Sequence, residues 1–111
     1  MWKRALRLSA TLILGWSPSL AAGDMRALTG IVTDKRGKAL PGSAVQIENS
    51  ITLTVRSYIT GKDGRYYFNY LNGDIDYTVK AKYRNYWSGA KTLSKFNESN
   101  HPEVNLEIPI D

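Results

Sequence analysis

The chain has 111 residues and no cysteine, and its 15 Lys and Arg residues exceed its 10 Asp and Glu residues. Three of the basic residues, Lys3, Arg4 and Arg7, stand at the N-terminus, which leaves 12 basic against 10 acidic residues in the remainder. An excess of that size does not indicate nucleic-acid binding. The absence of cysteine excludes both a disulfide framework and a lipid-attachment cysteine.

The N-terminal segment is typical of a secretory signal peptide. Its basic head precedes a short apolar run at residues 8–16, and Pro18 and Ala21 follow where a cleavage site is expected. The run is well short of the roughly 20 apolar residues that span a bilayer. We therefore expect a signal peptide helix at residues 1–21, export to the periplasm or beyond, and no membrane anchor after cleavage; an uncleaved anchor is the alternative.

Residues 22–111 have the size of one domain and the pattern of β-strands. Apolar and polar residues alternate between turn signals, and no stretch shows sustained helical periodicity. The expected fold is therefore all-β, a sandwich of two packed sheets. Seven strands are expected, at residues 25–33, 44–48, 52–60, 65–71, 76–84, 89–93 and 104–108.

Residues 60–71 predict the central hairpin of this sandwich. Gly61 and Gly64 flank a Lys-Asp pair, and such a sequence suits a tight turn. In the strand that follows, Tyr66, Phe68 and Tyr70 are expected on one face. The opposite face is expected to carry Arg65, Tyr67 and Asn69.

Two sequence runs resemble the signatures of carboxypeptidase regulatory-like domains. The first comprises residues 30–34 (GIVTD) and 37–45 (GKALPGSAV); the second comprises 64–68 (GRYYF), Leu71, Gly73 and 77–79 (YTV). The resemblance implies a transthyretin-like, seven-stranded antiparallel Greek-key sandwich at residues 22–111. The chain departs from the pattern at Ala39, where proline is usual, and at Ile75 and Asp76, which lengthen a turn. Its C-terminal part is similar to that of small stand-alone exported bacterial members.

The sequence offers little for catalysis. His101 is the one histidine, and it stands in a polar loop with no partner residue to orient it. The hydroxyisourate hydrolase branch of the transthyretin-like fold needs several histidines and a C-terminal Tyr-Arg-Gly-Ser, whereas this chain ends in IPID. We expect a protein that is not an enzyme and has no cofactor.

Four aspartates in turns, Asp34, Asp63, Asp74 and Asp76, raise the question of a calcium site. Aspartate is also expected in turns for backbone hydrogen bonding alone, and only Asp74 and Asp76 are close in sequence. The expectation is therefore that no metal is bound.

The candidate binding residues lie in one loop: Tyr83, Arg84, Asn85, Tyr86 and Trp87. Flat rings beside amide and cationic groups suit a protein contact or a sugar-binding surface. The alternative is that the rings close the end of the sandwich. Lys80, Lys82 and Arg84 are expected on a solvated outer face of the sheet. The alternative is that this basic row weakly binds an anionic partner such as a cell-surface polymer.

From these features we expect a non-catalytic exported module with a protein-interaction or structural role in the cell envelope. The alternative is a carbohydrate-binding module that uses the aromatic residues of the 83–87 loop, since starch-binding domains have a similar sandwich shape. The partner, whether protein or polysaccharide, and the oligomeric state are left open by the sequence.

Overall fold

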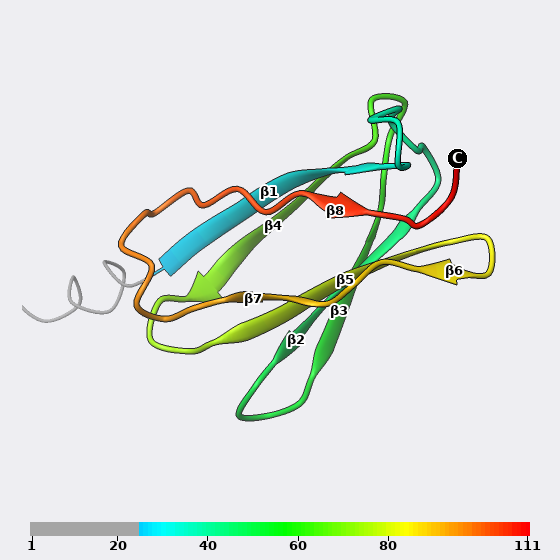
Figure 1. Ribbon diagram of the computed structural model, residues 1–111. Helices are drawn as coiled ribbons and strands as arrows, with labels where there is room; N and C mark the ends of the chain where they lie inside the picture. Colours follow the sequence, from blue (N-terminus) through cyan, green and yellow to red (C-terminus); the bar gives the residue numbers. More distant parts are fainter. Residues whose placement is uncertain (1–24) are drawn as a thin grey trace, which may run out of the picture.

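The computed structural model describes residues 25–111. This part of the chain contains eight strands arranged in two sheets (Figure 1). The strands are β1 (Met25–Thr33), β2 (Ala44–Asn49), β3 (Val55–Ile59), β4 (Arg65–Asn72), β5 (Tyr77–Tyr83), β6 (Tyr86–Trp87), β7 (Lys91–Leu93) and β8 (Leu106–Glu107). The described residues contain no helix. The predicted signal peptide, residues 1–21, lies outside them.

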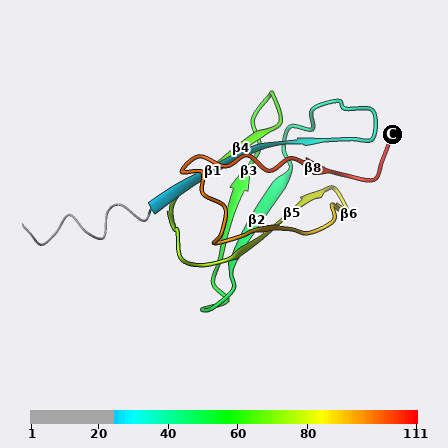
Figure 2. The ribbon, with the colours of Figure 1, turned by 60° about the vertical axis from the view of Figure 1, so that its left-hand side comes forward.

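The two sheets face each other across one core (Figure 2). One has the strand order β4-β1-β8, and the other has the order β3-β2-β5-β6, with β7 also pairing with β5. The predicted all-β sandwich is confirmed. Two details differ: the structure has eight strands because Tyr86 and Trp87 pair with β5, and β1 pairs with β8 in parallel. That pairing is parallel because residues 94–105 return the chain alongside β1 before β8 begins.

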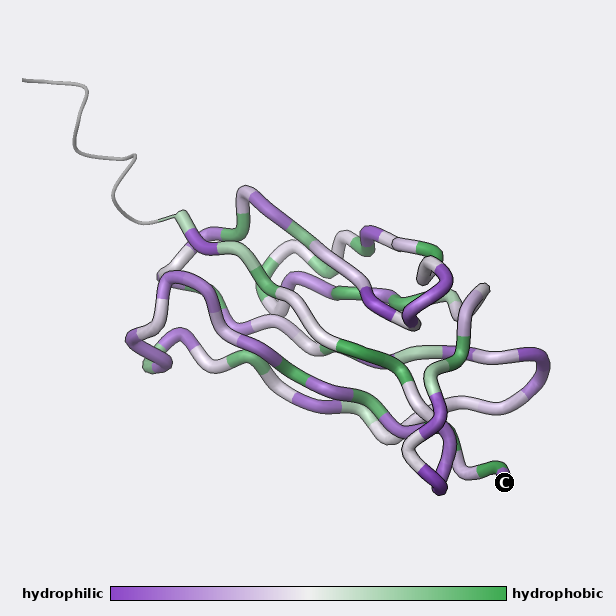
Figure 3. The backbone as a smooth tube through the Cα atoms, turned by 90° about the horizontal axis from the view of Figure 1, so that it is seen from above, coloured by the Kyte–Doolittle hydropathy of each residue, from purple (hydrophilic) through white to green (hydrophobic). Residues whose placement is uncertain are grey.

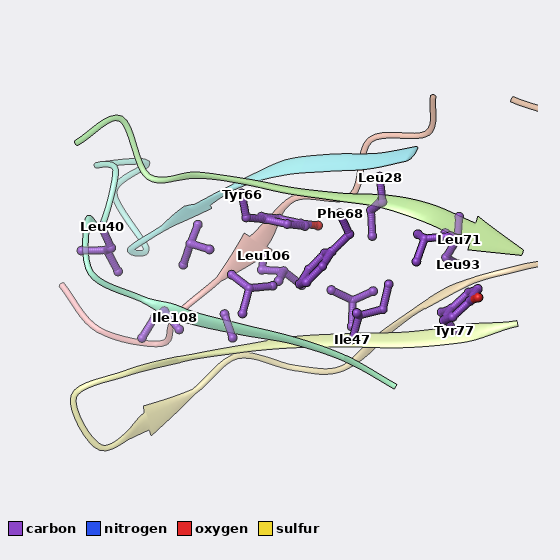
Figure 4. Packing of buried hydrophobic residues seen from close by; sticks show 14 residues of the cluster. Leu28, Leu40, Ile47, Tyr66, Phe68, Leu71, Tyr77, Leu93, Leu106 and Ile108 are labelled. Atoms are coloured by element: carbon purple, nitrogen blue, oxygen red, sulfur yellow. The ribbon is translucent and has the colours of Figure 1, made fainter. Parts of the chain in front are cut away.

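Strand alternation accounts for the core. Apolar and polar residues alternate along the strands (Figure 3). Each sheet therefore turns one row of apolar side chains inward. Figure 4 shows side chains from both sheets meeting in this space. The buried cluster comprises Leu28, Val32, Leu40, Val45, Ile47, Tyr66, Phe68, Leu71, Tyr77, Val79, Ala81, Leu93, Leu106 and Ile108.

Tyr70 does not share the inward face with Tyr66 and Phe68, and that prediction is wrong. Between the pairs Arg26–Leu71 and Leu28–Phe68, β4 has one residue more than β1, which is a β-bulge. Tyr70 sits in the bulge with φ 57° and is 75% exposed. The bulge reverses the alternation, so Leu71 is buried in its place.

Residues 60–71 turn as predicted but do not form a hairpin within one sheet. The turn closes with a 2.9 Å hydrogen bond from the Gly64 N–H to the Gly61 carbonyl. However, β3 pairs with β2 while β4 pairs with β1, so the chain crosses here from one sheet to the other. The buried Thr60 anchors the crossing, because its hydroxyl accepts from the Ser43 N–H and donates to the Leu40 carbonyl. The aromatic alternation is the same for a hairpin and a crossover, so the sequence did not distinguish them.

A tyrosine ring packed on a glycine joins the three-stranded sheet to the returning chain. The Tyr66 ring lies so close to Gly30 that an added Cβ would come within 2.5 Å of it and within 1.8 Å of the Val104 carbonyl oxygen. The Tyr66 hydroxyl donates a hydrogen bond to that carbonyl. Burial, and to a lesser extent the charge of Glu103, raises the pKa of Tyr66 well above its usual value of 10.0.

Arg26 makes a second buried link, which the sequence did not indicate. Its side chain is only 6% exposed, and it donates to the carbonyls of Ser94, Asn72 and Ile75. These carbonyls belong to the segment after β7, the last residue of β4 and the β4–β5 turn. The guanidinium therefore ties these segments to β1. Its hydrogen bonds to backbone carbonyls replace most of those that it would make to water.

We predict that Tyr66→Phe lowers the free energy of unfolding by about 1–2 kcal/mol at neutral pH, because the Val104 carbonyl loses its donor. The folded state holds the Tyr66 proton more tightly than the unfolded state, so this residue's contribution is complete below pH 10 and declines as the pH rises above it. The gap between wild type and variant should therefore narrow above about pH 10. Urea unfolding followed by circular dichroism measures both effects.

Tyr67→Phe is the matched control, because it removes the same hydroxyl from a ring that is 45% exposed. It should leave stability nearly unchanged. Equal losses in the two variants would contradict the assigned role of Tyr66.

Candidate functional site

The predicted binding residues form the hairpin that joins β5 to β6. Tyr83 pairs with Tyr86 across a two-residue turn made by Arg84 and Asn85. Arg84 has φ 57°, in the left-handed region that asparagine and glycine tolerate better. The hairpin is held at its base by Ser88, whose N–H donates to the Ala81 carbonyl and whose hydroxyl accepts from the Ala81 N–H.

Tyr86 and Trp87 are both exposed, but they lie on opposite faces of the sheet. Residues paired across antiparallel strands share a face, and successive residues alternate. Trp87 pairs with Lys82 and therefore lies on the outer face, whereas Tyr86 pairs with Tyr83 on the other face. The five residues predicted as one patch are thus divided by the plane of the sheet.

Trp87 is the centre of an aromatic and cationic surface on the outer face of the five-stranded sheet. The Lys80 ammonium lies 4.6 Å from its ring centroid and the Lys82 ammonium lies 5.4 Å from it, while the indole is 40% exposed. Neither lysine forms a salt bridge with a carboxylate among residues 25–111. We call Lys80, Lys82 and Trp87 the Trp87 surface. Its two ammonium groups are attracted by the indole ring but are not neutralised.

A hollow of about 200 Å³ adjoins the Trp87 surface on the same sheet face. Lys80 borders both features. The other lining residues come from β2, β3, β5 and the segment before β7: Gln46, Glu48, Val55, Thr78 and Ala90. The outer face therefore offers one exposed ring, two cations and a polar depression side by side.

Tyr83 and Arg84 belong to a different place. They line a hollow of about 350 Å³ together with Leu40, Pro41 and Ile110, at the end of the sandwich. The half-buried Tyr83 also packs against the core, and the Arg84 guanidinium lies 5.0 Å from its ring centroid. Tyr83 thus closes the end of the sandwich, which was the structural alternative for these rings.

A second group of exposed aromatic residues was missed by the sequence reasoning. Tyr67 and Tyr70, 45% and 75% exposed, line a hollow of about 490 Å³ with Met25, Asn69 and His101. The sequence predicts that Tyr67 faces outward, so it indicates one of the two exposed rings. It does not predict the bulge that turns Tyr70 outward.

Three of the four turn aspartates accept hydrogen bonds from backbone N–H groups. Asp34 accepts from the N–H groups of Arg36 and Lys38, Asp63 accepts from that of Arg65, and Asp76 accepts from that of Lys95. Within residues 25–111, no three His, Asp or Glu side chains gather closely enough to hold a metal ion. Nor does this part of the chain contain a helix long and apolar enough to cross a membrane.

Comparison of the sequence with family models gives one decisive result. The model of the carboxypeptidase regulatory-like domain matches residues 27–108, which is most of the chain. The chain belongs to this family. The predicted resemblance is thereby confirmed, whereas no curated protein sequence matches the chain.

Known structures confirm the fold expected of a carboxypeptidase regulatory-like domain. A DUF3823 family protein from Parabacteroides merdae is 22% identical with a TM-score of 0.55, and catechol 1,2-dioxygenase from Acinetobacter is 12% identical with a TM-score of 0.57. The matches cover 78% and 86% of this chain but only 46% and 55% of those proteins. The C-terminal domain of the shaft pilin SpaA from Lactobacillus rhamnosus GG is 12% identical with a TM-score of 0.50, over 76% of this chain and 98% of the pilin domain.

We predict that the ratio of iodide to caesium quenching is larger for Trp87 than for free N-acetyltryptophanamide, because the flanking ammonium groups attract the anion and repel the cation. The other two tryptophans, Trp2 and Trp16, lie in the predicted signal peptide, so the processed protein reports on Trp87 alone. Its intact mass should show that it begins at Ala22. Stern–Volmer quenching makes the measurement.

The double variant Lys80→Gln and Lys82→Gln should lower the iodide constant and raise the caesium constant, without changing quenching by neutral acrylamide. A Trp87 that neither ion reaches would contradict its placement on an exposed cationic surface.

Proposed function

We propose that this carboxypeptidase regulatory-like domain is a non-catalytic, exported binding module of the cell envelope that recognises an acidic protein segment. Family membership supports the modular role, because the matched region is a domain type rather than a complete enzyme. A sandwich fold hosts many functions, so the argument rests on the surface itself.

The observation that carries the proposal is the exposed indole beside two unneutralised lysines. Tryptophan is enriched at the energetic centres of protein interfaces, and complementary charge sets both the rate and the specificity of association. The lysines on the Trp87 surface would pair with Asp or Glu side chains of a partner. The adjoining hollow of about 200 Å³ would take one of its smaller side chains.

The same geometry argues against sugar stacking on the 83–87 loop. A sugar ring needs an open aromatic face, usually with a second ring nearby. The ammonium groups of Lys80 and Lys82 already lie over the Trp87 ring, and Tyr86 is on the other face of the sheet. A protein partner fits this surface better than a neutral polysaccharide does.

Export is supported by the pattern of residues 1–21, with its basic head, short apolar run and cleavage signal. The similarity in fold to the SpaA shaft pilin domain agrees with a place at the cell surface. An envelope module of this kind would act outside the cytoplasm and present the Trp87 surface to neighbouring proteins.

We predict that the double variant Lys80→Glu and Lys82→Glu loses at least tenfold in affinity for the envelope partner, since two attractive charges become repulsive. Trp87→Ala should lose a similar amount because it removes the apolar centre of the contact. Wild type serves as bait in envelope extract, the captured protein is identified, and its affinity for each variant is measured by calorimetry.

Lys35→Glu with Lys62→Glu is the matched control, because it makes the same charge change at two exposed turn positions outside the Trp87 surface. This variant should bind like wild type. Equal losses of affinity in the two double variants would show that net charge, and not the Trp87 surface, controls binding. Affinity retained in both the Lys80→Glu/Lys82→Glu and the Trp87→Ala variants would refute the proposal.

A second candidate function, carbohydrate binding, is favoured by the hollow at Tyr67 and Tyr70. Two exposed rings there adjoin the polar side chains of Asn69, Asn100 and His101. Its volume of about 490 Å³ falls within the range of small-molecule sites. Aromatic rings flanked by amides are the combination that the Trp87 surface lacks.

If this second function holds, Tyr70→Asn should abolish binding on a polysaccharide array, while Trp87→Ala should retain it. Asparagine suits the left-handed backbone at position 70, so the variant should still fold, which circular dichroism checks. An array on which wild type binds no glycan would remove this candidate and leave the protein-binding proposal intact.

A further inference from the structure

Strand β3 has a free edge. It pairs with β2 along one side, and no strand of the described chain pairs with its other side. All five residues of β3 are exposed, including Val55, Tyr58 and Ile59 at 52%, 39% and 62%. An uncovered edge of this kind presents unpaired backbone groups and is a template for another strand.

The hydrogen bonds at the ends of β3 show which residues face the free side. The Thr54 carbonyl accepts from the Asn49 N–H, and Thr60 both donates to the Ser43 carbonyl and accepts from the Gly42 N–H. Backbone groups alternate in direction along an antiparallel strand, so positions 54, 56, 58 and 60 bond inward to the β2 side. The N–H and C=O groups of Val55, Ser57 and Ile59 therefore point away from the sheet.

The usual protection of an edge strand is absent from β3. Natural edges are blocked by lysine, proline or a bulge, and β3 contains none of these. Its one charged residue is engaged within the molecule. Arg56 donates to the Asn69 carbonyl at 2.9 Å and lies 5.5 Å from the centroid of the Phe68 ring. The charge is thus held towards β4 and does not guard the free edge.

We propose that β3 pairs with β3 of a second copy of this chain, antiparallel about a twofold axis at Ser57. In this register Ser57 faces Ser57 of the second copy, and Val55 faces Ile59 at each end. All three facing pairs are made by residues whose backbone groups point outward, so each pair can exchange two hydrogen bonds. A twofold axis at Val55 or Ile59 would leave most of the strand unpaired.

The side chains of β3 are self-complementary in this register. On the outer face the branched apolar side chain of Val55 meets that of Ile59, and the small Ser57 side chains meet at the axis. On the inner face Arg56 lies opposite Tyr58, which places a cation beside an aromatic ring twice. No like charges face each other, and at each end of the paired strands the Val55 and Ile59 side chains cover one another.

Pairing through β3 has a consequence for the Trp87 surface. The twofold axis is perpendicular to the joined sheet, so the outer faces of both copies lie on the same side. Trp87 is on that face at the opposite edge of each sheet. The dimer would present two Trp87 surfaces in one direction, and a partner with repeated acidic segments would gain from binding both.

Analytical ultracentrifugation of the full chain, purified as the cell processes it, tests the pairing over a wide range of concentration. Wild type should change from monomer to dimer as the concentration rises. Val55→Lys and Ile59→Glu should each weaken dimerisation by about tenfold or more, because a charge then faces an apolar side chain. Ile51→Lys is the matched control: it adds the same charge at a position 70% exposed but outside β3, and it should dimerise like wild type.

Mixing the Val55→Lys and Ile59→Glu proteins tests the register itself. Their heterodimer brings the introduced lysine against the introduced glutamate at one end and keeps the native apolar pair at the other, so association should recover relative to either variant alone. Circular dichroism confirms that the variants fold. A wild type that stays monomeric throughout, a dimer indifferent to both substitutions, or a mixture that fails to recover would each overturn the proposal.

Discussion

The packing of Tyr66 on Gly30 is the constraint on which the rest of the sandwich depends. A side chain at position 30 would collide with both the ring and the Val104 carbonyl, so only glycine lets β4, β1 and the returning chain come together. The hydroxyl of Tyr66 then fixes that returning segment through the same carbonyl. Because the segment precedes β8, this contact also sets where β8 meets β1 and where Leu106 and Ile108 enter the core.

The crossing of the chain from β3 to β4 determines which edges of the sandwich are open. Each of these strands is the last in its sheet, and the two lie on the same side of the molecule. Arg56 and Tyr58 of β3 bridge the gap by contacting Phe68 of β4, with the tyrosine ring edge-on at 6.1 Å. These contacts seal the core along this side, and they leave the backbone of β3 available for a further strand.

The two edges of the five-stranded sheet carry different kinds of side chain. At one edge β3 carries exposed apolar side chains and free backbone groups, which suit strand pairing. At the other edge β6 carries Trp87 beside two lysines, which suits charged side chains of a partner. Hydrogen-bonded strands join the two edges, so the proposed self-association at β3 would leave Trp87, Lys80 and Lys82 at the other edge uncovered.

The amino-acid sequence by itself determined the all-β class, the family and most strand positions, because alternation and turn residues are local signals. It also made Trp87 a candidate binding residue and predicted that Tyr67 faces outward, and both side chains are exposed. The tertiary structure decided that residues 60–71 cross between sheets, that a bulge exposes Tyr70, and that Tyr86 and Trp87 lie on opposite faces. Each depends on which strand pairs with which and in what register, and pairing between residues distant in sequence leaves no local pattern.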